Sequence, residues 1–81
     1  MKILLSRTDG LLLECIELDG VHTIGFDIGF LVVTFKDEDA YEQAQKKTGW
    51  FAWDEYGLSL EMPLHNGKTK IHDLEYSVWL E

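Results

Sequence analysis

The sequence is poor in the residues that cross-link chains and bind phosphates. It contains one cysteine, Cys15, and one proline, Pro63, among 81 residues. A single cysteine excludes an intrachain disulfide, and the N-terminus shows no signal-peptide pattern, so we expect a cytoplasmic protein. Seven basic residues stand against 15 acidic ones, which gives a formal net charge of −8. This charge repels phosphates, so we expect neither nucleic acid nor a membrane surface as a partner.

Patterns typical of enzymes and metal sites are also missing. No apolar run approaches the roughly 20 residues that span a bilayer. His22, His65 and His72 have no recognised metal-ligand spacing, and Asp37-Glu38-Asp39 lacks the further oxygen ligands of a calcium loop. No nucleophile lies near a base in a recognisable pattern. We therefore expect no enzyme, no metal and no cofactor, and we interpret Cys15, which lies among leucines, as a small buried hydrophobe.

The composition instead indicates one small α+β domain over residues 1–81. Hydrophobic residues make up 46% of the chain and aromatic residues 12%, which excludes disorder. Short apolar runs predict strands at 2–6, 11–18, 21–26 and 30–35. Turn signals separate them, and Asp19-Gly20 in particular predicts a hairpin. The run at 11–18 is apolar on both faces, which predicts that its start is covered on both sides or that it bulges near Glu14.

One helix is expected before Gly49, a natural left-handed cap. The acids of Asp37-Glu38-Asp39 suit the N-terminal end of the helix dipole. Asp39 and Glu42 have the spacing of a capping box. A thin stripe of small residues predicts the buried face, which consists of Tyr41, Ala44 and Thr48.

The last third of the chain predicts further strands. Residues 58–64 alternate strictly, and Pro63 indicates an edge strand or a bulge. Asn66-Gly67 predicts a two-residue hairpin turn, which would place Glu61 opposite His72.

After this hairpin the apolar residues change from odd to even positions along the chain. The chain must therefore kink or bulge at His72-Asp73 before a final strand at 74–80. In that strand Trp79 points away from the apolar face. The predicted order is β-β-β-β-α-β-β-β. It indicates a small antiparallel twisted sheet, or a partly open barrel, of about six to seven strands with one helix.

The densest mixture of aromatic and acidic residues follows Gly49. It consists of Trp50, Phe51, Trp53, Asp54, Glu55 and Tyr56. These rings could form much of the core. Aliphatic positions already fill the interior of so small a domain, however, so we expect at least one of Trp50, Trp53 and Tyr56 to be exposed. The other predicted core positions are Ile3, Leu4, Leu5, Leu13, Ile16, Ile24, Phe26, Leu31, Val33, Phe35, Leu58, Leu60, Met62, Val78 and Leu80.

Two functions fit these observations. The first is a non-enzymatic protein-binding module, of the inhibitor or immunity type, in which residues 50–56 dock a basic protein surface. The alternative is a homo-oligomeric protein, with a small-ligand-binding or structural role, that uses its surplus apolar surface for self-association. We expect a dimer or larger assembly at micromolar concentration, formed through an edge strand or a sheet face.

Overall fold

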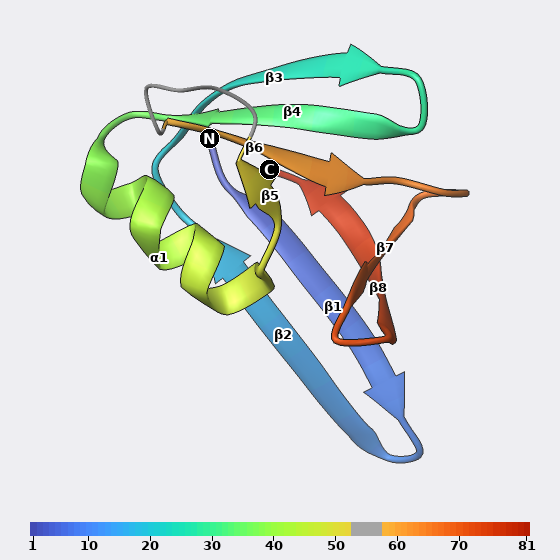
Figure 1. Ribbon diagram of the computed structural model, residues 1–81. Helices are drawn as coiled ribbons and strands as arrows, with labels where there is room; N and C mark the ends of the chain where they lie inside the picture. Colours follow the sequence, from blue (N-terminus) through green and yellow to red (C-terminus); the bar gives the residue numbers. More distant parts are fainter. Residues whose placement is uncertain (53–57) are drawn as a thin grey trace.

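In the part of the chain that it describes, the computed structural model contains two antiparallel sheets and one helix (Figure 1). It describes residues 1–52 and 58–81. In chain order the elements are β1 (Ile3–Asp9), β2 (Leu12–Leu18), β3 (Val21–Asp27), β4 (Phe30–Phe35), α1 (Glu38–Thr48), β5 (Phe51–Ala52), β6 (Ser59–Pro63), β7 (Lys68–Ile71) and β8 (Leu74–Leu80). The α+β class and the antiparallel pairing are confirmed.

The prediction of a single sheet or partly open barrel is wrong. The first sheet has the strand order β2-β1-β8-β7 and the second has the order β3-β4-β6-β5. Asp19-Gly20 is therefore not a hairpin turn, because it carries the chain from β2 in the first sheet to β3 in the second. Two sheets can bury their apolar faces against each other, which a single open sheet with one thin helix cannot do.

The core lies between the inner faces of the two sheets. From the first sheet it takes Ile3 and Leu5, and from the second it takes Val33 and Leu60, all fully buried. Three predicted core residues lie at the surface instead, because each has a neighbouring strand on one side only: Leu13, Phe26 and Leu80.

The helix begins two residues earlier than the capping-box pattern predicts. Asp37 is extended, with φ −152° and ψ 172°, and its side chain accepts a hydrogen bond from the Ala40 N–H at 2.8 Å. Gly49 ends the helix in the left-handed region at φ 70°, as predicted. The predicted buried face is confirmed, and it consists of Tyr41, Ala44 and Thr48.

The turn at Asn66-Gly67 is also confirmed. His65 and Lys68 exchange two backbone hydrogen bonds, of 2.9 and 3.0 Å, and φ is 51° at Asn66 and 73° at Gly67. The ladder stops after this pair. The next hydrogen-bonded pair would join Pro63 to Lys70, and proline has no N–H to donate. From this point β6 stays in the second sheet while β7 joins the first.

The predicted break at His72-Asp73 is present, but it is a second tight turn rather than a kink or bulge. The two residues have φ values of 50° and 64°, and they join Ile71 directly to its partner Leu74. The prediction that Glu61 lies opposite His72 is therefore wrong. Glu61 is in the second sheet, where it pairs with Phe51 of β5. The apolar residues change parity after Ile71 because the chain turns at His72-Asp73 and runs back as β8.

Candidate protein-interaction surface

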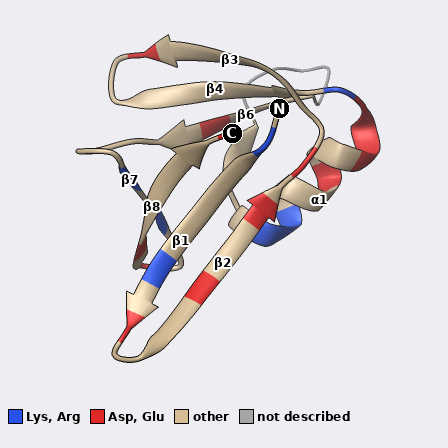
Figure 2. Ribbon diagram, turned by 180° about the vertical axis from the view of Figure 1, so that it is seen from behind, with Lys and Arg blue, Asp and Glu red and all other residues tan. Residues whose placement is uncertain are grey.

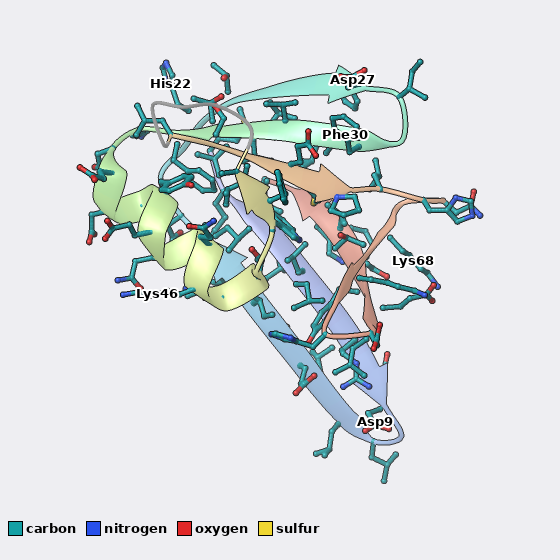
Figure 3. The ribbon with its side chains drawn as sticks, in the orientation of Figure 1. Asp9, His22, Asp27, Phe30, Lys46 and Lys68 are labelled. Atoms are coloured by element: carbon teal, nitrogen blue, oxygen red, sulfur yellow. The ribbon has the colours of Figure 1, made fainter. Side chains whose placement is uncertain are left out.

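The hairpin of β1 and β2 extends beyond the rest of its sheet. β2 pairs with β1 along Ile3–Asp9, whereas β8 pairs with β1 only from Ile3 to Ser6. Residues 7–14, called the distal arm below, therefore form a two-stranded ribbon without a third strand. Figures 1 and 2 show this projection from opposite sides, and Figure 3 places Asp9 near its far end. Such a ribbon is only marginally stable in water when nothing covers it.

Three consecutive leucines occupy the tip of the distal arm. Relative to full exposure, Leu11 is 105% exposed, Leu12 71% and Leu13 68%. Leu12 and Leu13 point to opposite faces of the ribbon, because side chains alternate along a strand. The prediction that the start of this strand is covered on both sides, or bulged near Glu14, is wrong. The pairing of β2 with β1 is regular, and the start is uncovered.

A polar cluster holds the base of the distal arm against β8. The Arg7 guanidinium donates to Glu14 Oε2 at 2.7 Å and lies 4.0 Å from the Asp9 carboxylate. The Tyr76 hydroxyl also donates to Glu14 Oε2, at 3.3 Å, and the Arg7 guanidinium carbon lies 6.0 Å from the centre of the Tyr76 ring. These contacts fix the arm in one direction, so a partner meets a preformed surface.

The same contacts shift three ionisation equilibria. The hydrogen bond from Arg7 lowers the pKa of Glu14, and the same bond raises the pKa of Arg7. Burial is the main reason why the pKa of Tyr76 is raised. Glu14 is thus ionised and paired with Arg7 of its own chain, and the other charged side chain of the arm, Asp9, lies 4.0 Å from the same guanidinium.

The outer edge of β2 is open along part of its length. In a strand, the backbone N–H and C=O of alternate residues point to the same side. The Glu17 carbonyl points away from β1, because it accepts a hydrogen bond from Lys47 of α1 at 3.0 Å. The backbone groups of Leu13 and Cys15 point the same way, and the hydrogen bond from Lys47 goes to the Glu17 carbonyl.

The other three sheet edges carry features that discourage strand pairing. β7 presents Lys68 and Lys70, and β5 is only two residues long. The register of β3 shifts between Val21 and Thr23. β2, by contrast, is seven residues long and regular, and its open part is apolar.

The predicted aromatic-acidic site divides between core and surface. Trp50 is 4% exposed and belongs to the core, while Phe51 is 77% exposed on β5. The remaining predicted residues lie outside the described residues, namely Trp53, Asp54, Glu55 and Tyr56. Within residues 1–52 and 58–81, then, the structure leaves Phe51 as the exposed ring of this segment.

Cys15 lies at the surface of β2. Cys15 is exposed, against the prediction of a buried thiol, because its side chain lies on the outer face of an edge strand. Among the described residues, no group of three or more histidine, cysteine or acidic side chains is placed to hold a metal ion. No described helix is long and apolar enough to cross a membrane.

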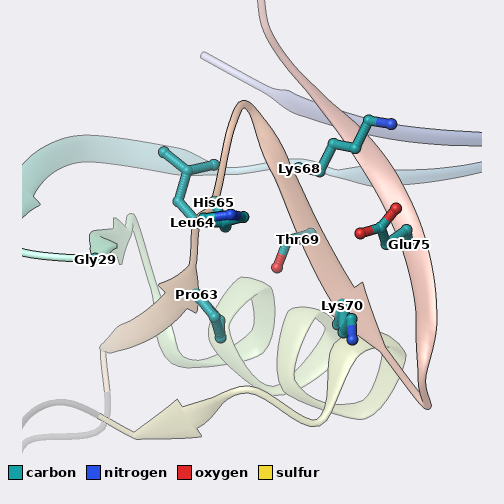
Figure 4. A pocket seen from close by; sticks show the side chains of 8 residues that line it. All are labelled: Gly29, Pro63, Leu64, His65, Lys68, Thr69, Lys70 and Glu75. Atoms are coloured by element: carbon teal, nitrogen blue, oxygen red, sulfur yellow. The ribbon is translucent and has the colours of Figure 1, made fainter.

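A cavity of about 500 Å³ lies where β6 and β7 separate (Figure 4). Its origin is the interrupted ladder at Pro63, and it is open to solvent between the two legs of the hairpin. The buried Thr69 hydroxyl has no hydrogen-bond partner among the described residues. The lining residues are Gly29, Pro63, Leu64, His65, Lys68, Thr69, Lys70 and Glu75.

Comparison of the chain with protein-family models, with curated proteins and with solved structures gave no significant match.

Proposed function

We propose that this protein is a non-enzymatic protein-binding module that acts through the distal arm. The observation that carries the proposal is the combination of exposed Leu11, Leu12 and Leu13 with the open backbone of β2. A partner strand added to this edge would form main-chain hydrogen bonds with Leu13 and Cys15. The leucines would supply apolar contact on both faces of the new strand pair.

The contacts at the base of the arm support this function. Arg7, Glu14 and Tyr76 hold the ribbon in place before a partner arrives, which reduces the ordering that binding requires. The Lys47 contact with the Glu17 carbonyl limits pairing to the first half of β2. The interaction surface is therefore ordered before a partner binds, and it ends where Lys47 occupies the Glu17 carbonyl.

Phe51 supports a second surface with the same general function. Its exposed ring on β5 adjoins the acidic segment of the sequence that includes Asp54 and Glu55. An exposed aromatic ring next to an acidic stretch of the sequence suits a basic protein surface, as an inhibitor or immunity-type protein would require.

The experiment compares Leu13→Lys with Ile28→Lys. Ile28 lies in the turn between β3 and β4 and is 93% exposed, so it is a matched control for adding a lysine at a hairpin. A lysine at Leu13 should block strand addition, as lysines do on natural edge strands. Both variants should melt close to the wild type, because neither side chain is in the core.

Association is measured by sedimentation velocity, for copies of the chain, and by pull-down from cell extract, for other proteins. We expect Leu13→Lys to lose the complexes that the wild type forms and Ile28→Lys to keep them. Equal association of the two variants would overturn the proposed function, as would a wild type that associates with nothing.

A further inference from the structure

We propose that the strand added to β2 is β2 of a second copy, so that two chains form a two-fold symmetric dimer with Leu13 opposite Leu13. This inference rests on the proposed function of the distal arm and names its partner. It joins the first sheets of the two copies edge to edge, with β2 of one chain antiparallel to β2 of the other.

The contacts of β2 decide at which residue the two-fold axis of the dimer crosses the strand pair, and so the register of the two copies. An axis at Cys15 would place Leu13 opposite Glu17 of the second copy, whose carbonyl Lys47 already occupies. An axis at Glu14 would place two carboxylates directly opposite each other, which destabilises a strand pair. An axis at Leu13 uses only residues 11–15, and it leaves the hydrogen bond from Lys47 to the Glu17 carbonyl in place.

The electrostatics of this window favour a second copy over a basic partner. Each chain carries a formal net charge of −8, so two copies repel unless their contact surface is neutral. Within residues 11–15 the only charged side chain is Glu14, and Arg7 of the same chain neutralises it at 2.7 Å. Charges beyond the window are screened over about 8 Å at physiological ionic strength. Within the window Glu14 is already paired with Arg7, which leaves no unpaired charge to attract a basic strand, and in this register Leu13 meets Leu13 of the second copy.

The dimer would bury only part of the exposed apolar area. With these exposures, Leu11, Leu12 and Leu13 offer roughly 400–500 Å² per copy. Edge-to-edge pairing leaves the outward sides of Leu12 and Leu13 in solvent, so the interface lies below the total of about 1,000 Å² at which stable specific interfaces begin. We therefore expect a dimer that forms at micromolar concentration and dissociates on dilution.

Disulfide trapping tests the register. Leu13→Cys is made together with Cys15→Ser and oxidised at a concentration where the wild type self-associates. In the proposed dimer the two position-13 residues form a hydrogen-bonded pair with Cα atoms about 5.5 Å apart, within the range of about 4.4–6.8 Å that disulfides span. We expect a covalent dimer on a non-reducing gel.

The matched control is Leu12→Cys in the same Cys15→Ser background. Position 12 opposes Glu14 of the second copy, so the two introduced thiols are offset by two residues and lie too far apart to join. The native Cys15 thiols of the wild type are offset by four residues and should also stay unlinked. All proteins are first checked by circular dichroism melting, and the exposure of Leu12 and Leu13 predicts normal folding.

Cross-linking at position 13 alone, with a wild-type dimer that Leu13→Lys converts to monomer, supports the inference. Cross-linking through native Cys15, or equally at position 12, overturns the register. A wild type that sediments as a monomer at high micromolar concentration overturns the dimer itself. If that monomer still captures another protein, and Leu13→Lys abolishes the capture, the arm function stands without the second copy. If Leu13→Lys changes nothing, both proposals fail.

Discussion

The packing of α1 against the connection between β2 and β3 depends on one glycine. Gly20 has φ 72°, and a Cβ added to it would lie 2.8 Å from the Ala40 Cβ in the first turn of the helix. Its carbonyl also accepts a hydrogen bond from the Lys36 N–H at 2.8 Å, so the backbone there has little freedom to move. Gly20→Ala therefore forces a strained backbone and a collision at the same position.

The two costs can be separated with Gly10→Ala. Gly10 has a similar φ, 63°, but an added Cβ would meet nothing within 4 Å. A left-handed alanine costs roughly 1–2 kcal/mol, and overpacking adds about 1–3 kcal/mol. We expect Gly10→Ala to lower the free energy of unfolding by about 1 kcal/mol and Gly20→Ala by about 2–4 kcal/mol. In a domain of this size the difference between the variants corresponds to a melting temperature roughly 5–20 °C lower for Gly20→Ala.

Urea unfolding followed by far-ultraviolet circular dichroism measures both variants. A Gly20→Ala protein as stable as Gly10→Ala would refute the close approach of helix and turn. The same result would undermine the interaction surface, because α1 carries the Lys47 side chain that closes the far end of the β2 edge.

Three further predictions concern single side chains. Trp50→Phe should cost only about 1 kcal/mol, well below the roughly 3–5 kcal/mol of Trp50→Ala, because the buried indole N–H has no partner among the described residues. Thr69→Val should raise the free energy of unfolding in urea by about 1 kcal/mol, since it removes a buried hydroxyl that no described group pairs with. The pKa of Glu14 is lowered in the folded state by Arg7, so its stabilisation is complete above the ordinary value of 4.5 and is lost as pH falls through the lower folded value. Glu14→Gln should therefore flatten the pH dependence of stability below 4.5, and an unchanged acid-unfolding curve would contradict this.

Local features of this fold could be predicted from the sequence because they depend on neighbouring residues. Asn66-Gly67 forms its turn because both positions tolerate positive φ, and Gly49 ends the helix for the same reason. The buried face of α1 follows from helical periodicity alone. None of these features requires knowledge of distant contacts.

The assignment of strands to sheets could not be predicted in this way. Asp19-Gly20 has the composition of a hairpin turn, but it carries the chain from β2 in one sheet to β3 in the other and passes close to Ala40 of α1. Pro63 does indicate that a ladder ends, but not that β7 then pairs with β8 in the other sheet. Both outcomes depend on which apolar strand faces pack against each other in the folded protein, and distant parts of the chain decide this.

The sequence does not predict the distal arm, for a related reason. Leucine in a strand pattern normally indicates burial, so the sequence places Leu13 in the core and Cys15 among buried leucines. Only the length of β1 relative to its pairing with β8 shows that residues 7–14 have no third strand. The available signal was the position of three leucines directly after the glycine of a turn, where a buried strand has not yet begun.

Salt separates the two proposed surfaces by the sign of its effect. Binding of a basic protein near Phe51 and the acidic segment should weaken as ionic strength rises, because screening removes the attraction. The proposed dimer should behave in the opposite way. Its contact window is neutral, while the net charges of −8 on the two chains repel, so added sodium chloride screens only the repulsion. Sedimentation equilibrium at low and high salt should therefore show tighter self-association at high salt. Dissociation of the dimer by salt would contradict the neutral window and would favour the charged surface instead.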